Sequence, residues 1–381
     1  MNHSQDLVLG GTIPIPPQAL VLGGKLALEV GLNSSIPSQR IQALRQVFPQ
    51  LGAAPLLAAL GDRSTQIRLA ARLTLSHHQP HHPALTKYQD FTKFTCLCRL
   101  KAHHQPISAL ALSPNQPLLA SSAMDSSIKV WDLVAGTNHQ ILQGHQAQVN
   151  CLVINHNHII SGSRDRTIKV WDLTSGTNTH TLTGHLGYVN SIAITDHILV
   201  SGSQDSTVKL WHLPTGQNYA TIHAHTNLVN TIALSRDGQL IATCTYNTTI
   251  RLWQTTTGQQ IGEFIGHSAR VWCFAITPDN QYLISGSRDR LIKIWHIDSG
   301  QEIARLEGHK GDVKAMVLSQ DGKFLFSASY KEIKIWHLKT LTPIATLKGH
   351  QAVINTIALA PDHSLLITGS EDHDIYIWGV A

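Results

Sequence analysis

Residues 161–176, SGSRDRTIKVWDLTSG, combine a Ser-Gly-Ser-x-Asp motif, a strand-like apolar run that ends at Trp171, and a closing turn rich in Ser, Thr and Gly. Nearly the same letters return at 201–216, SGSQDSTVKLWHLPTG, and at 285–300, SGSRDRLIKIWHIDSG. A segment that recurs at a fixed interval is typical of a repeat architecture, in which neighbouring units complete one another's core. The stretch therefore marks one unit of an internally repeated fold.

Seven units are present, because a tryptophan recurs at intervals of 40 to 42 residues, at Trp131, Trp171, Trp211, Trp253, Trp295, Trp336 and Trp378. A histidine, in most units preceded by glycine, lies 26 to 28 residues before each tryptophan, at His103, His145, His185, His225, His267, His309 and His350. Short β-branched and aliphatic runs, separated by Gly, Asp, Asn or Pro, predict four strands per unit. A sheet of that size cannot bury both faces alone, so the units must stack.

The order Gly-His, Ser-Gly-Ser-x-Asp and Ile-Lys-Val-Trp-Asp, at a spacing near 40 residues, resembles the WD-repeat β-propeller family. The likeness covers residues 94–381. It implies an all-β, seven-bladed propeller, to which the chain adds a small α-helical N-terminal region.

In the family resembled, the histidine, a Ser or Thr of the second strand, the aspartate of the turn and the tryptophan form a hydrogen-bonded row inside each blade. The resemblance carries this row onto five complete sets: His103, Ser121, Asp125 and Trp131; His145, Ser161, Asp165 and Trp171; His185, Ser201, Asp205 and Trp211; His267, Ser285, Asp289 and Trp295; His350, Thr368, Asp372 and Trp378. A buried indole, hydroxyl and imidazole each need a partner, and one carboxylate can anchor the row.

Two units depart from this pattern. The fourth has Asn247 in place of the aspartate, and the sixth reads SASYKEIKIW, one residue short, so that Lys331 or Glu332 takes the turn. We expect both blades to be locally less stable, by about 1 kcal/mol.

A Ser, a His and an Asp within one row also resemble a hydrolase triad. A nucleophile needs one exposed site with an oxyanion hole, whereas this set recurs from unit to unit with its serine in the middle of a strand. No phosphate-binding loop, catalytic carboxylate pair or unique nucleophile is found in the sequence. We therefore predict no enzymatic activity and no cofactor, and a hydrolase or metal-dependent enzyme is the remote alternative.

The last unit has only three strands, since DIYIWGVA, residues 374–381, follows directly on its second. The strand-like FTCLCRL, residues 94–100, belongs to no other unit. We expect residues 94–100 to pair with 374–380 and close the ring, which removes two exposed sheet edges.

The N-terminal ninety residues divide into an extended segment (1–33), short helices (34–77) and a linker (78–93). Pro55 in a first helical turn and Ser64 as an N-cap favour two of the helices. The run DRSTQIRLAARLTL, residues 62–75, resembles the second helix of a HEAT-type repeat, and the whole region resembles leaders of cyanobacterial multidomain proteins. Three short helices are too few to stand alone, so we expect them to pack on the propeller or on a partner.

The segment SHHQPHHP, residues 76–83, contains four histidines in six positions, and clustered imidazoles can bind Zn²⁺ or Ni²⁺. No cysteine or carboxylate lies nearby in the sequence. We therefore predict no metal site there.

The amino-acid composition limits the cellular compartment and the classes of partner that we expect. The net charge of +5 is small for 381 residues and is spread along the chain, which gives no case for binding to nucleic acid or to an anionic membrane. Five cysteines without a disulfide framework favour a reducing compartment, and no run of eighteen apolar residues is present. We expect a cytoplasmic protein without membrane insertion.

In the family resembled, partners most often bind the rim formed by the Gly-His and Asp-turn loops. The side chains expected at this rim that offer large contact area are Arg164, Tyr188, Gln204, Tyr246, Arg270, Trp272, Arg288 and Tyr330. Arginine and aromatic residues are enriched at binding hot spots, and arginines beside aromatics suit an acidic or phosphorylated peptide. The alternative is that each is an ordinary solvated loop residue.

These observations predict a non-enzymatic scaffold or adaptor that binds partner proteins or peptides on the propeller rim. Residues 1–90 would provide a second contact, to a larger complex. The alternative is a regulatory or assembly subunit of a bacterial signalling or photosynthetic complex.

Overall fold

The computed structural model describes residues 32, 39–44, 52–62, 64–79, 82–195 and 198–380. Seven antiparallel sheets of four strands account for the chain from Phe94 onward. Blades one to three are β2 (Ile107–Leu112), β3 (Leu118–Ala123), β4 (Ile128–Asp132) and β5 (Thr137–Leu142); β6 (Val149–Asn155), β7 (His158–Ser163), β8 (Ile168–Asp172) and β9 (Asn178–Leu182); β10 (Val189–Ile194), β11 (Ile198–Ser203), β12 (Val208–His212) and β13 (Gln217–Ile222).

Blades four to six are β14 (Thr231–Leu234), β15 (Leu240–Cys244), β16 (Ile250–Gln254) and β17 (Gln260–Phe264); β18 (Val271–Ile276), β19 (Tyr282–Ser287), β20 (Ile292–His296) and β21 (Glu302–Leu306); β22 (Val313–Leu318), β23 (Phe324–Ser329), β24 (Glu332–His337) and β25 (Thr342–Lys348). Blade seven is β26 (Ile354–Leu359), β27 (Leu365–Ser370), β28 (Asp374–Val380) and, from the other end of the propeller, β1 (Phe94–Lys101).

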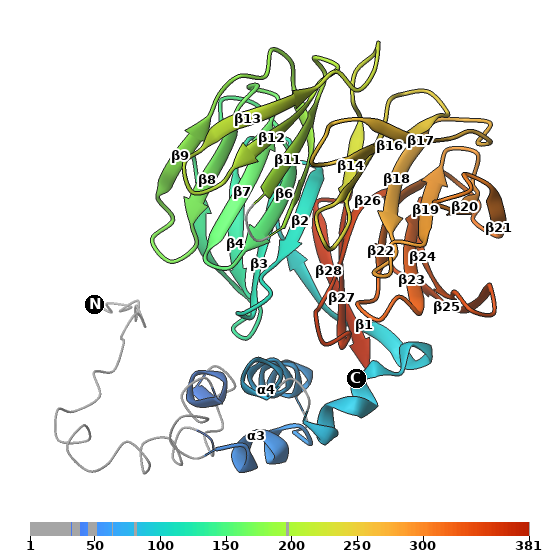
Figure 1. Ribbon diagram of the computed structural model, residues 1–381. Helices are drawn as coiled ribbons and strands as arrows, with labels where there is room; N and C mark the ends of the chain where they lie inside the picture. Colours follow the sequence, from blue (N-terminus) through green and yellow to red (C-terminus); the bar gives the residue numbers. More distant parts are fainter. Residues whose placement is uncertain are drawn as a thin grey trace, which may run out of the picture.

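The sheets close into a ring (Figure 1). The first strand of each blade contacts the first strands of both neighbouring blades, and β26 of the last blade contacts β2 of the first. First strands therefore surround the axis and fourth strands form the outer surface. The prediction of a seven-bladed β-propeller is confirmed.

Burial explains why the middle strands are so apolar. The second strands are buried on both faces and most third-strand residues are buried too, and in blade two Ile159 and Ile168 have no exposed surface. The outer strand β9 is exposed at every residue except Leu182. Apolar clusters join neighbouring blades, as where Val149 and Trp171 of blade two pack with blade one. Each blade thus buries the face that its neighbour would otherwise expose.

The ring is sealed by pairing between the two ends of the propeller. β1 pairs antiparallel with β28, from Phe94 opposite Val380 to Lys101 opposite Asp374. β28 pairs on its other side with β27, so both edges of this strand are satisfied.

The leader packs on the ring. Two of its α-helices are α3 (Ala54–Ala59) and α4 (Thr65–His78), and Figure 1 shows them beside the part of the ring where the C-terminus lies. Leu56 and Leu75 are fully buried in one apolar cluster with Leu133 and Leu365 of the propeller. Arg72 of α4 donates from Nη1 to the carbonyl oxygen of Val380 at 3.0 Å.

The leader covers the rim opposite the Gly-His and Asp-turn loops. Gln89 donates to the carbonyl oxygen of Asp362, in the turn between β26 and β27, and the Ser76 hydroxyl donates to the carboxylate of the same residue. Leu133 directly follows β4. In a four-stranded meander, these turns lie at the other end of the strands from the loops that enter the first strand and join the second to the third.

The structure corrects two expectations about the leader, and a third concerns residues outside the described part of the chain. Ser64 is the N-cap residue of α4, but its side chain makes no capping hydrogen bond, and its backbone N–H donates to Oδ1 of Asp62 at 2.7 Å. The predicted linker, residues 78–93, holds two 3₁₀ helices, η2 (Pro83–Gln89) and η3 (Phe91–Lys93). The predicted extended segment 1–33 is outside the described residues except for Leu32.

Phe91 explains why this linker is docked. Its ring lies edge-on to Phe324 and Phe326 of blade six, with ring centroids 4.9 and 5.0 Å apart. The partners are far away in the sequence, so local patterns of Pro and His gave no sign of them.

Candidate functional site

A hydrogen-bonded row of four side chains runs through each of five blades. The histidine precedes the first strand, the hydroxyl lies on the second, the aspartate is in the turn and the tryptophan is on the third. In blade two, Trp171 Nε1 lies 2.9 Å from Ser161 Oγ, which lies 2.7 Å from His145 Nε2, and His145 Nδ1 lies 2.7 Å from Asp165 Oδ2. Blades one, three, five and seven have the same contacts, with histidine–aspartate distances of 2.7 to 3.3 Å.

The donors and acceptors fix the direction of the row. The indole N–H can only donate, so the hydroxyl oxygen accepts from it and the hydroxyl proton is free to bond to Nε2 of the histidine. Nδ1–H then donates to the carboxylate, which suits a neutral imidazole. Burial lowers the pKa of His103 and of His267, although the neighbouring aspartates favour the charged form.

The aspartate is held ionised by the same contacts. Burial alone would raise the pKa of Asp372, but hydrogen bonds from His350 and from the backbone N–H of Gln351 hold it at about 2. Asp165 and Asp205 are shifted in the same direction, to well below the usual range for aspartate, by equivalent contacts that outweigh burial.

This row has the connectivity of a hydrolase triad but lacks access for a substrate. Ser121, Ser161, Ser201 and Ser285 have no exposed surface. Each of these hydroxyl oxygens already accepts an indole N–H. A nucleophile must be reachable by the group that it attacks, so the row serves to hold the blade together.

Blade four has lost the last member of the row. His225 and Trp253 still bond to Thr243, at 2.9 and 2.8 Å, but the side-chain oxygen of Asn247 accepts from the backbone N–H of Thr249. In the five complete blades the residue after the aspartate has a positive φ, whereas no residue in this turn does. Burial, with a further contribution from Arg251, lowers the pKa of His225 to about 4.

Blade six brings a carboxylate near its histidine from a different position, without the hydrogen bond that the aspartate makes in the complete blades. Lys331 occupies the shortened turn together with Tyr330, while Glu332 is the first residue of β24. A Glu332 carboxylate oxygen lies 3.6 Å from His309 Nδ1, and neither atom has a hydrogen-bond partner among the described residues. Burial, followed by the charge of Lys334, lowers the pKa of His309 to about 3.

A second repeated contact links neighbouring blades at the start of the innermost strands. Five residues after the histidine, a side chain donates to a backbone carbonyl at the start of the next blade. The bonds are Ser108 to Val149 at 2.5 Å, Asn150 to Val189 at 3.0 Å, Asn190 to Val229 at 2.8 Å and Asn355 to Ile107 at 3.0 Å. Each of these four blades is therefore linked to the next by the same kind of side-chain hydrogen bond.

Blades four to six break this regularity. Asn230 accepts a hydrogen bond of 2.5 Å from Nη2 of Arg270. Trp272 donates from Nε1 to Oδ2 of Asp312 at 3.3 Å. Lys314 Nζ lies 3.4 Å from a carboxylate oxygen of Glu371. The equivalent positions here carry side chains that form hydrogen bonds or an ion pair with other side chains instead of with the backbone of the next blade.

Arg270 is the centre of this irregular part of the rim. Its guanidinium carbon lies 3.3 Å from the ring centroid of Tyr246 and 3.7 Å from that of Trp272, so the group is stacked between two aromatic rings. Burial lowers the pKa of Arg270, partly offset by Tyr246, but a guanidinium remains charged in proteins. Its Nε is buried and has no hydrogen-bond partner among the described residues. We name Tyr246, Arg270 and Trp272 the arginine sandwich.

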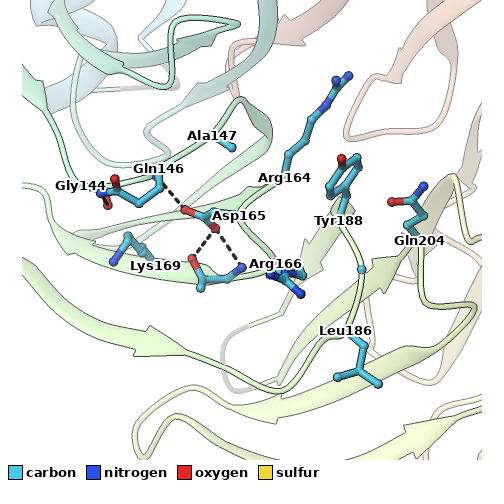
Figure 2. A pocket seen from close by; sticks show the side chains of 12 residues that line it. Gly144, Gln146, Ala147, Arg164, Asp165, Arg166, Lys169, Leu186, Tyr188 and Gln204 are labelled. Atoms are coloured by element: carbon cyan, nitrogen blue, oxygen red, sulfur yellow. Dashed lines mark hydrogen bonds between the residues drawn. The ribbon is translucent and has the colours of Figure 1, made fainter.

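Three other candidate residues meet in a groove of about 670 Å³ between blades two and three (Figure 2). They are Arg164, Tyr188 and Gln204. The guanidinium carbon of Arg164 lies 5.8 Å from the ring centroid of Tyr188. The structure thus places seven of the eight candidates in two groups. Arg288 belongs with the arginine sandwich, because its backbone N–H donates to the carbonyl oxygen of Arg270. Tyr330 lies apart, next to Lys331 in blade six.

Comparison with protein families identifies the repeats. A family described as "WD domain, G-beta repeat" matches seven consecutive stretches: residues 94–132, 136–172, 176–212, 216–254, 258–296, 300–337 and 341–379. The chain belongs to the WD40 repeat family. WD40 proteins generally act as protein-interaction scaffolds, and their propellers are typically non-enzymatic.

Curated relatives share part of this WD40 propeller. A mitochondrial division protein 1 from Neurospora crassa is 36% identical over 87 residues, 23% of this chain and 13% of the relative. One from Pyricularia oryzae is 31% identical over 108 residues, 28% of the chain and 15% of the relative. A Lissencephaly-1 homolog from Monosiga brevicollis is 32% identical over 79 residues, 20% of the chain and 19% of the relative. The chain thus matches less than a fifth of the length of each.

Several residues of these two groups were not predicted. Asp312 and Lys314 extend the arginine sandwich, and Arg166 and Leu186 line the groove. Each occupies a fixed offset in the repeat, so alignment of the units at every position around the histidine and the aspartate would have drawn attention to them.

Neither a metal cluster nor a membrane-spanning helix is found in the described part of the chain. No group of three or more metal-ligating side chains comes together there. Pro80 and His81 of the histidine-rich segment lie outside that part. No described helix has the length and apolar character needed to cross a bilayer.

Proposed function

We propose that this WD40 protein is a non-enzymatic scaffold that binds partner proteins or peptides on the rim of the Gly-His and Asp-turn loops. The observation that carries the proposal is the arginine sandwich. In four blades the position of Trp272 bears an Asn or Ser that links neighbouring blades, so a bulky aromatic here is not needed to close the ring.

The chemistry of the sandwich suits protein recognition. Arginine and aromatic side chains give large contact areas with hydrogen-bonding ends. Stacking between Tyr246 and Trp272 limits the conformations of Arg270 before any partner binds, which lowers the entropy cost of binding. Tyr246 is 48% exposed, so part of this surface is open to a partner.

The leader is proposed as the second contact, with residues 1–90 tying the propeller to a larger assembly. Its described helices cover the rim opposite the sandwich, so the two contacts would not compete. The HEAT-type and cyanobacterial likenesses and a cytoplasmic location remain parts of this proposal. A bacterial signalling or photosynthetic complex gains no support from the three relatives above.

The test is affinity purification from the native cell with quantitative mass spectrometry. We expect a triple variant, R270A/W272A/R288A, to lose specific partners of the parent protein. Gln148→Ala, at the position of Arg270 in blade two, is the matched control and should retain them. An unchanged set of partners in the triple variant, with its melting temperature preserved, would rule out this part of the rim.

A further inference from the structure

The groove between blades two and three has an excess of positive charge. Arg164, Arg166 and Lys169 line it, together with a single carboxylate, Asp165. Lys169 is held by the outer strand, since its Nζ donates to the hydroxyl of Thr181 at 3.0 Å. Both arginines are exposed, so their charge is available to a partner.

The carboxylate of Asp165 does not neutralise them, because the blade already uses it. Oδ2 accepts from His145 and from the backbone N–H of Gln146, and Oδ1 accepts from the backbone N–H and the hydroxyl of Thr167. Figure 2 shows Asp165 turned toward Gln146, with the side chain of Arg164 extending away from it. Every acceptor site of this anion is therefore engaged within blade two.

An apolar surface adjoins the two arginines. Leu186 is 83% exposed and Tyr188 is 42% exposed, and both belong to the loop that enters blade three. An isoleucine or leucine of a partner placed here would remove apolar area from water on both molecules, which favours binding. The groove therefore offers charge and apolar contact side by side.

Blade five can be compared with blade two, because it carries the same arginine pair. The pattern Arg-Asp-Arg also occurs in blade five, as Arg288, Asp289 and Arg290. There the neighbouring loop presents Lys310 and Asp312 at the positions of Leu186 and Tyr188. Blade five thus has the arginine pair without the apolar surface, and only blades two and three combine both features.

We propose that this groove binds an extended acidic segment of a partner protein, with carboxylates on Arg164 and Arg166 and an apolar side chain on Leu186 and Tyr188. The inference rests on the proposed function and names the partner chemistry of a second part of the same rim. In Figure 2 the guanidinium group of Arg164 lies well apart from that of Arg166, so the pair matches carboxylates at separate positions better than a single phosphate group.

Binding to three immobilised pools of twelve-residue peptides tests this. Position nine is Leu in every pool, and all positions not named here are random. The first pool has Glu at positions five and seven, and the second has Lys at both. The third has Ser at positions five and seven and one phosphoserine at position six. We expect the full chain to be retained at least about tenfold more strongly by the Glu pool than by the Lys pool, a preference that weakens with salt.

Two double variants locate the site. R164A/R166A should lose the preference for Glu, while R290A/K310A removes equal charge from the equivalent place between blades five and six and should keep it. L186A should weaken retention on the Glu pool. Matching melting temperatures exclude unfolding as the cause.

Equal retention on the Glu and Lys pools would overturn the inference, as would equal losses in the two double variants. Stronger retention on the phosphoserine pool would overturn the choice of an acidic segment. If the peptides are not distinguished while the sandwich variants still lose native partners, the proposed function stands and this inference fails.

Discussion

Arg99 on β1 donates from Nε to Oδ2 of Asp374 on β28 at 2.6 Å, and thereby joins the first strand of the propeller to the last. The Asp374 side chain is 7% exposed, whereas that of Arg99 is 50% exposed. The same guanidinium lies over the ring of Tyr376, with 5.5 Å between its carbon and the ring centroid. One side chain therefore supplements the backbone pairing at the seam of the ring.

Deletion of the last seven residues should make the protein insoluble. This change removes most of β28, which lies between β1 and β27, so both of those strands become unpaired edges. Solubility after expression and size-exclusion chromatography are the measurements. Arg99→Ala is the milder companion, which should leave a soluble propeller whose β1 amides exchange hydrogen faster. A soluble, monomeric truncation with unchanged melting would contradict the role of the seam.

Asp205→Ala should destabilise the protein by about 2 to 3 kcal/mol, because the buried imidazole of His185 and two backbone N–H groups lose their acceptor. The donors are Nδ1 of His185 and the backbone N–H groups of Leu186 and Thr207. Asn247→Ala in blade four is the control and should cost less, since Asn247 makes no bond to the histidine of its blade. Urea denaturation of both variants gives the comparison, and equal losses would show that the carboxylate adds nothing to the row.

The repeats made most of the fold predictable. Regular spacing of Trp131, Trp171 and their equivalents determines the number of blades, and β-branched runs determine the strands. The row of His, Ser, Asp and Trp came from a resemblance, and the hydrogen bonds found here give its physical basis. These features recur from unit to unit, so the sequence shows each of them several times.

Features that occur once were harder to predict. The contact of Phe91 with blade six joins residues more than two hundred positions apart, and no local pattern encodes it. The position of Glu332 depends on how a turn shortened by one residue is accommodated. For the rim, the sequence placed Arg270 and Trp272 near each other, but only the coordinates reveal that the guanidinium is stacked between two rings.

Acid should destabilise the protein through His309. Its pKa is about 3 in the folded state, while an unfolded histidine has a pKa of about 6.5, so between these values the unfolded state binds the extra proton. Stability must then fall as the pH falls from about 6.5, by at most about 1.4 kcal/mol per pH unit for this group. Asp372, with a pKa of about 2, loses its contribution only below about pH 4.

His309→Gln should therefore flatten the dependence of unfolding free energy on pH between 6.5 and 4.5. Chemical denaturation at several pH values measures the slope. His139→Gln, at an exposed position of β5, should leave the slope of the parent chain. If the His309 variant keeps the parent slope, the folded-state imidazole is not the group that resists protonation.

Trp272→Asn should abolish partner binding and leave the stability of the protein nearly unchanged. The variant restores the residue found at this position in blades two, three, four and seven, and its amide could donate to the carbonyl oxygen of Val313 as Asn150 and Asn190 donate to the next blade. We expect the free energy of unfolding to stay within about 1 kcal/mol of the parent value, while partner capture is lost. Urea denaturation and affinity purification on one preparation measure both. A loss of stability well above that value would mean that Trp272 is retained for packing, and the case for a binding surface at the arginine sandwich would lose its main support.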